Sequence, residues 1–142
     1  MTIRIRWAAI GGKGDPMWRW SGVLYSYIAP GGKEILYIGK AAGATSTVRS
    51  RWNADDKAGF WRDLERERGI FSHAVAVGEI NVGPGGRLTR ELLADLESLL
   101  IKWEQPWGNI QGRRKRKFSC PGMEVRCSGD WPGRKQYWDG EE

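Results

Sequence analysis

The stretch that decides the fold is Gly-Val-Leu-Tyr-Ser-Tyr-Ile-Ala at 22–29, followed by Pro-Gly-Gly-Lys at 30–33 and Glu-Ile-Leu-Tyr-Ile-Gly at 34–39. The two outer segments are rich in β-branched and aromatic residues, which is typical of strands. The segment between them has the composition of a turn. We therefore predict a β-hairpin with Tyr25 on its first strand and Tyr37 on its second.

Periodicity predicts the elements that follow the hairpin. Ser46 or Thr47 can cap a short helix that ends at Trp52, and Asp55 or Asp56 can begin another that runs to about residue 68. A third strand is expected at 71–77. The clearest helix is expected at 87–102, where leucines recur at i, i+3, i+4 and i+7 and a proline follows the end.

These elements predict an α+β fold with a small three-stranded, mainly antiparallel sheet and flanking helices. Three segments are expected: an irregular N-terminal extension at 1–21, in which a short strand is possible, a folded domain at 22–109, and an irregular C-terminal extension at 110–142. The last segment carries a cationic run, and its end carries Trp131, Tyr137 and Trp138.

Composition restricts the functional classes. The chain has 142 residues, nine of them Trp, and a net charge of +6, which favours an acidic partner, nucleic acid before a membrane surface. No apolar run is long enough for a membrane span, and the first residues do not form a signal peptide, so a soluble cytoplasmic protein is expected. With two cysteines and one histidine, Cys and His alone cannot supply four zinc ligands. The same shortage excludes a Ser-His-Asp or Cys-His hydrolase unless His73 is its base.

Glu97 has an unusual position on the long helix. At 100° per residue it falls just beyond the edge of the leucine-rich face. A carboxylate at that rim can point into a cleft. His73 is expected at the start of the third strand, and its distance from any site is left open.

Together these residues resemble the GIY-YIG nuclease superfamily over residues 22–109. Val23-Leu24-Tyr25 and Tyr37-Ile38-Gly39 stand for the two tripeptides, and Arg49-Ser50-Arg51-Trp52 for the helix that delivers an arginine. The segment from Glu97 through Gln105-Pro106 to Asn109 matches the family's glutamate, Gln-Pro and asparagine. Two departures occur: the first tripeptide lacks its leading glycine, and Asp55 stands where the family often has His or Tyr.

The resemblance implies a metal-dependent endonuclease acting on DNA. Glu97 would hold one Mg²⁺ or Mn²⁺, Arg51 would bind the scissile phosphate, and Tyr25 would position or deprotonate the attacking water. Lys40 would assist Tyr25, Tyr37 would orient a water or the phosphate, and Asn109 would anchor the surroundings by amide hydrogen bonds.

Nucleic-acid contacts are expected from further positions. Gly39 would let the protein backbone approach a ligand closely, and Arg49 would help to position the bound nucleic-acid strand. The cationic run is expected to follow the phosphate backbone; it consists of Arg113, Arg114, Lys115, Arg116 and Lys117. One active site cuts one strand, so a double-strand cut would need a homo-oligomer or two nicks. The alternative interpretation is a non-catalytic nucleic-acid-binding module on the same fold.

Overall fold

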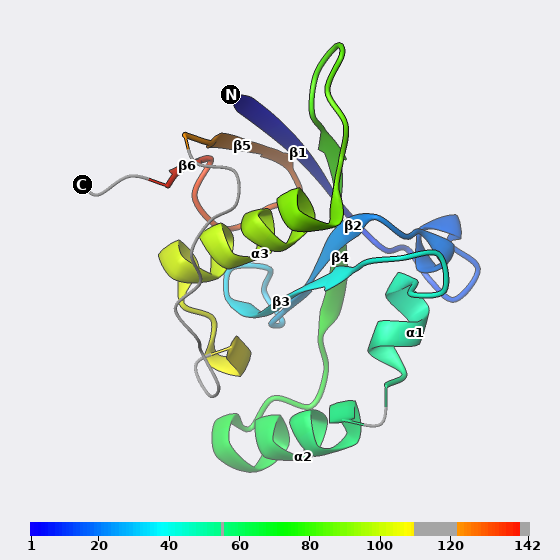
Figure 1. Ribbon diagram of the computed structural model, residues 1–142. Coiled ribbons are helices and arrows are strands. Elements are labelled where there is room, and N and C mark those ends of the chain that lie inside the picture. Colours follow the sequence, from blue (N-terminus) through cyan, green and yellow to red (C-terminus); the bar gives the residue numbers. More distant parts are fainter. Residues whose placement is uncertain (55, 110–121, 140–142) are drawn as a thin grey trace.

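Six strands form one mixed sheet in the computed structural model, which describes residues 1–54, 56–109 and 122–139 (Figure 1). Their order in the sheet is β3-β2-β4-β1-β5-β6. The strands are β1 (Thr2–Ala9), β2 (Val23–Ile28), β3 (Ile35–Ala41), β4 (Ala74–Asn81), β5 (Glu124–Gly129) and β6 (Gln136–Trp138). Neighbours run antiparallel except β1 and β5, which are parallel.

The prediction of a three-stranded sheet with irregular extensions is therefore wrong. The antiparallel strands β3, β2 and β4 do lie together, but β1 pairs with the free edge of β4 and β5 pairs with β1. Both added strands alternate buried and exposed residues, with Ile3, Ile5 and Trp7 inward from β1 and Val125 and Cys127 inward from β5. Each strand thus has one apolar face, and that face becomes buried when the strand pairs with the edge of the sheet.

The register of the β2–β3 hairpin decides which side chains meet. Tyr27 is opposite Tyr37, and a shift next to that pair then aligns Ile28 with Ile35. Further along, Tyr25 is opposite Gly39. Because opposed residues share a face of the sheet, the three tyrosines lie on one side, where their rings pack together.

The helices begin and end where capping chemistry allows. They are α1 (Val48–Trp52), α2 (Asp56–Arg68) and α3 (Arg90–Glu104), with short 3₁₀ turns η1 (Pro16–Arg19) and η2 (Trp107–Asn109). Thr47 caps α1 as predicted, and Thr89 caps α3, which therefore begins three residues later than the leucine pattern predicted. Gln105 ends α3 in the left-handed conformation, with φ of 51°.

The sheet is covered on both faces. Helix α3 packs its leucines on one face, against inward side chains of β1, β2 and β5 (Figure 1). The other face carries the tyrosines and is covered by residues from η1, α1 and α2. Trp7 of β1 stacks on Trp131 with ring centroids 4.1 Å apart, which ties the first strand to the segment after β5. Among the described residues, no helix has the length and apolar character needed to cross a membrane.

Candidate active site

Tyr25 and Tyr37 lie side by side in the candidate site. Their ring centroids are 6.1 Å apart, and Tyr27 lies 5.6 Å from Tyr25 and 5.4 Å from Tyr37. Tyr25 is almost fully buried, at 1 % exposed. The hairpin register and the aromatic packing therefore hold both phenol rings in fixed positions.

Gly39 has a packing role in the hairpin. The Tyr25 ring lies across it, so a Cβ at position 39 would be 2.5 Å from the Tyr25 hydroxyl oxygen and would also overlap ring carbons. The absent side chain accommodates the tyrosine ring, and the approach of a ligand to this backbone stays a prediction. Gly39 thereby sets where the Tyr25 hydroxyl lies.

The Tyr25 hydroxyl is a buried polar group without a well-formed hydrogen bond to the described residues. Burial raises the pKa of Tyr25, while the neighbouring Arg51 guanidinium and Tyr37 hydroxyl act in the opposite direction and the Glu97 carboxylate adds to the rise. Burial also raises the pKa of Tyr37, assisted by Tyr25 and Glu97 and opposed by Arg51. These mutual effects show that the four side chains lie close together.

The two arginines of α1 have separate environments. Arg51 lies beside Tyr25. Arg49 donates from Nη2 to the Lys13 carbonyl at 2.7 Å, and its guanidinium lies 5.7 Å from the Trp18 ring centroid. Arg49 is thus engaged with the loop after β1, whereas Arg51 reaches the tyrosine cluster.

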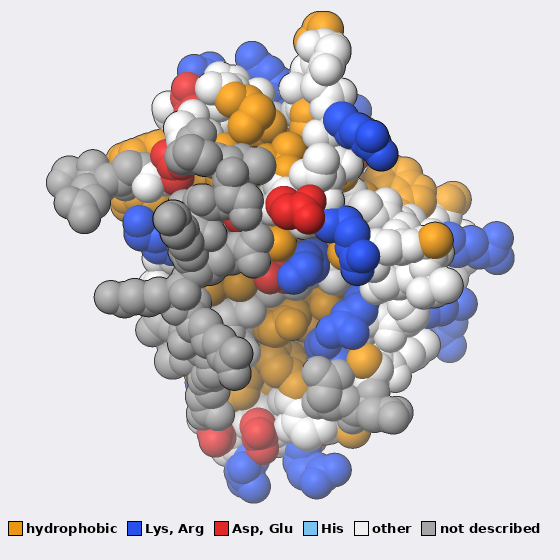
Figure 2. Space-filling model, viewed as in Figure 1, with side chains coloured by type: hydrophobic (Ala, Val, Ile, Leu, Met, Phe, Trp, Pro, Cys, Tyr) orange, Lys and Arg blue, Asp and Glu red, His pale blue; other side chains and the backbone are white. Residues whose placement is uncertain are grey.

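Glu97 projects from α3 toward the same place and pairs with Lys40 of β3. The Lys40 Nζ is 3.4 Å from the Glu97 Oε1, and the carboxylate-bearing side chain is 20 % exposed. Lys40 was predicted to assist Tyr25, but its recorded partner is the carboxylate. Figure 2 shows acidic side chains adjoining Lys and Arg side chains near the centre of the face, between α3 and α1.

A divalent metal at Glu97 was predicted, and the residues can be tested for it. No cluster of three or more His, Cys, Asp or Glu side chains exists in the part of the chain that the structure describes. Mg²⁺ differs from zinc because it binds through one or two carboxylates and keeps several waters. A single, partly exposed carboxylate beside buried tyrosines fits such a water-rich ion, and Glu97 would be its protein ligand.

Asn109 joins the end of α3 to the edge of the sheet. Its Oδ1 accepts from the Ile38 N–H at 2.8 Å and its Nδ2 donates to the Ile38 carbonyl at 3.0 Å, so its amide pairs with β3 as another strand would. Gln105 assists by donating from Nε2 to the Lys102 carbonyl at 2.8 Å. Asn109 thus anchors the strand that carries Tyr37 and Lys40.

Several predicted residues cannot be placed. The cationic run 113–117 and Asp55 lie outside the described residues, so their predicted roles stay predictions. The chain otherwise brings Tyr25, Tyr37 and Arg51 together with Glu97 and Lys40.

Sequence reasoning missed Lys57 near the site. Lys57 is 3 % exposed, and its ammonium lies 5.0 Å from the Tyr37 ring centroid. Its position in the first turn of α2 resembles that of any solvated helix lysine. The only available signal was its spacing from Phe60, Trp61 and Leu64, which places it near the apolar face of that helix.

Comparison with known proteins finds no family model, no curated protein and no solved structure that matches this chain. The resemblance to GIY-YIG nucleases therefore rests on the sequence motifs.

Proposed function

We propose that the chain is a metal-dependent endonuclease that hydrolyses phosphodiester bonds of DNA. The observation that supports this most is the convergence of Tyr25, Tyr37, Arg51 and Glu97 from four different elements. Within this cluster the Tyr25 hydroxyl is buried, with the Arg51 guanidinium and the Tyr37 hydroxyl as its polar neighbours and no hydrogen bond of good geometry to either. Buried polar atoms without partners are rare in folded proteins and indicate a position where a ligand or water completes the bonding.

In the proposed reaction, Arg51 binds two oxygens of the scissile phosphate with its planar guanidinium. The attacking water would lie on the Tyr25 hydroxyl, which the Arg51 guanidinium adjoins. Because burial raises its pKa, Tyr25 keeps its proton near neutral pH. It therefore orients the water through an oxygen lone pair rather than acting as a preformed phenolate. A divalent metal on Glu97 would supply electrostatic stabilisation of the leaving oxygen.

Lys40 and Tyr37 have supporting roles. The Lys40 Nζ lies 3.4 Å from the Glu97 Oε1 and holds that carboxylate in position. Tyr37 lies between the Tyr25 ring and the Lys57 ammonium, where its hydroxyl can hydrogen-bond the phosphate or a water. Asn109 does not contact the substrate in this proposal; it fixes the backbone of β3, the strand that carries Tyr37 and Lys40.

The second candidate is a non-catalytic nucleic-acid-binding module. One observation favours it: the Lys40–Glu97 ion pair offsets the repulsion that a lone carboxylate would exert on a polyanion. In that case Glu97 would need no metal. The two functions differ in whether bound DNA is cut.

Supercoiled plasmid distinguishes these candidates. With Mg²⁺ present, the endonuclease gives nicked or linear product, and a chelator abolishes it. Glu97→Gln should lose cleavage but still retard the plasmid. Glu91→Gln, an exposed carboxylate in the first turn of the same helix, is the matched control and should cleave normally. Intact but retarded plasmid under all conditions would establish the binding module instead.

A further inference from the structure

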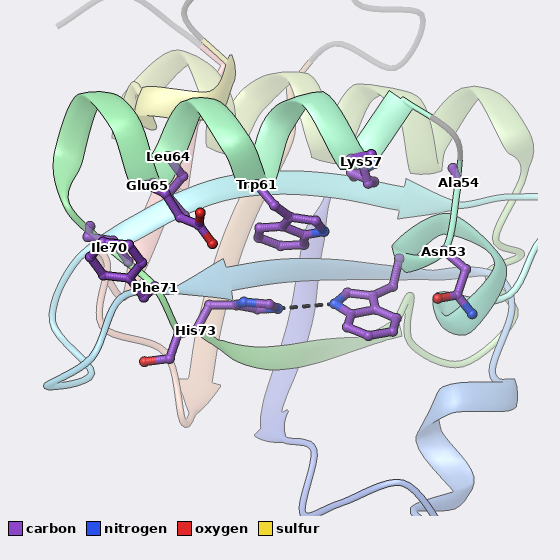
Figure 3. Close-up of a pocket in the computed structure, with 12 residues that line it drawn as sticks. Asn53, Ala54, Lys57, Trp61, Leu64, Glu65, Ile70, Phe71 and His73 are labelled. Carbon is purple, nitrogen blue, oxygen red and sulfur yellow. Dashed lines mark hydrogen bonds between the residues drawn. The ribbon is translucent and has the colours of Figure 1, made fainter.

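A pocket of about 490 Å³ lies beside the candidate active site and has no role in it. It is bounded by the end of α1, one face of α2 and the segment that leads into β4 (Figure 3). Its volume is in the usual range for sites that bind small organic groups, roughly 300–1,000 Å³. The pocket is therefore large enough for a single planar ring system with room for water.

Aromatic rings make up much of the pocket wall. The His73 imidazole stacks on Trp61 with centroids 4.0 Å apart and an angle of 14° between planes. The Trp52 Nε1 donates to His73 Nε2 at 3.0 Å. Figure 3 shows the Trp61 ring lying over the His73 imidazole. Because Nε2 accepts a hydrogen bond and burial lowers the pKa of His73, the imidazole is neutral near pH 7. The result is a fixed, uncharged aromatic wall.

Polar groups surround that wall. Asn53, Lys57 and Glu65 line the pocket, and side chains of these types supply both donors and acceptors. A heterocycle with ring nitrogens and exocyclic amino or keto groups matches this mixture of flat apolar faces and polar edges.

The pocket shares two residues with the surroundings of the tyrosine cluster. Lys57 lines the pocket while its ammonium lies 5.0 Å from the Tyr37 ring centroid. Trp52 lines the pocket and directly follows Arg51 in the chain. Lys57 and Trp52 thus connect the pocket to the surroundings of the tyrosine cluster, where the phosphate of a bound strand would lie.

We propose that this pocket holds one unstacked nucleobase of the nucleic-acid strand that the candidate active site engages. The proposal rests on the proposed function and specifies its substrate as a strand with a base outside the helical stack. Phe71 lines the pocket and is 77 % exposed, an unusual position for a large apolar side chain. A base in the pocket gives that ring a stacking partner.

The test compares two DNA duplexes that are identical except at a single-nucleotide bulge, which carries either a normal base or an abasic sugar. Binding is measured by fluorescence anisotropy in chelator, so no cleavage occurs. Stacking of one base on aromatic side chains predicts that the wild type binds the base-bearing bulge about 5- to 150-fold more tightly.

Two variants on α2 then locate the effect. Ala58→Trp adds an indole at an exposed position that lines the pocket and should abolish the preference. Gly59→Trp adds the same indole at the next residue, outside the pocket lining and with no atom near its Cβ, and should retain it. Phe71→Ala removes an exposed ring and should reduce the preference while leaving the urea unfolding midpoint unchanged.

Equal affinity for the two duplexes in the wild type would overturn the proposal, and so would an unchanged preference in Ala58→Trp. The plasmid assay with Mg²⁺ is run on the same proteins. Cleavage without any base preference rejects the pocket but leaves the endonuclease. A base preference without cleavage rejects the endonuclease and supports a base-binding pocket in a binding module.

Discussion

The contact between Gly39 and the Tyr25 ring makes Gly39→Ala a test of how the candidate site is positioned. A Cβ at residue 39 would meet the Tyr25 hydroxyl oxygen at 2.5 Å, well inside van der Waals contact. The ring cannot tilt away easily, because Tyr27 and Tyr37 pack beside it at 5.6 and 6.1 Å. Overpacking of this kind costs about 1–3 kcal/mol of folding free energy. The displaced hydroxyl should lower kcat by about 10²-fold, since misplacement by about 1 Å has that effect.

Urea unfolding and plasmid cleavage measure the two effects. At a typical urea dependence, the stability loss lowers the unfolding midpoint by roughly 1 M. Gly59→Ala is the control, because α2 leaves open space at that position and alanine should stabilise the helix by about 0.5–1 kcal/mol.

A double-mutant cycle with Tyr25→Leu shows whether the ring is the cause. Leucine lacks the ring atoms that the new Cβ would meet, so Gly39→Ala in that background should cost little, or even stabilise the strand by about 0.5 kcal/mol. The same loss in both backgrounds would refute this explanation of Gly39, and the position would then be constrained by something other than Tyr25.

Four further predictions concern separate parts of the molecule. Arg51→Ala should reduce the cleavage rate by about 10²–10³-fold, the usual cost of losing a transition-state contact, whereas Arg49→Ala should mainly weaken binding; steady-state kinetics separate these effects. Replacing 113–117 with Ser and Gln should flatten the slope of log affinity against log salt by roughly 2–4, measured by titration at several salt concentrations, and leave saturated turnover unchanged. Asn109→Leu should cost about 1–3 kcal/mol in urea unfolding, because two backbone groups of Ile38 lose their partner. Burial lowers the pKa of His73 below 6.5, so the unfolded chain binds the proton more tightly than the folded chain does. The free energy of unfolding should therefore fall as the pH drops below about 6.5. An NMR titration of this histidine should give a pKa below 6.5.

The sequence was informative where periodicity or capping decides structure. The leucine pattern of α3, the Thr47 cap and the β2–β3 hairpin follow from local chemistry, and the structure contains all three. The number of residues between Glu97 and Asn109 can be explained only from the path of the folded chain. It is the length of chain needed to end α3, turn at Gln105 and return an amide to the Ile38 backbone.

The missed features depend on partners far away in the chain. Strand β5 alternates Val125 and Cys127 with exposed residues, but in only six residues the pattern is too short to distinguish from an irregular tail. Its partner β1 lies about 120 residues earlier, and no local signal links them. The aromatic pocket was missed because Trp52, Trp61 and His73 come from α1, α2 and the segment before β4, and only the fold brings them together.

The parallel pairing of β1 with β5 has a consequence for the order of folding. The hairpin strands β2 and β3 are close in the chain and can pair early, whereas β1 needs β4, about 70 residues later, and then β5. During synthesis on the ribosome, β1 therefore emerges well before β4 and β5, the two strands that complete its hydrogen bonds. Its long unpaired interval exposes a strand edge and the Trp7 indole, the conditions under which nascent chains associate with one another. The Trp7–Trp131 stack forms only at the end, so its near-ultraviolet circular dichroism would report the final docking step rather than the formation of the tyrosine cluster.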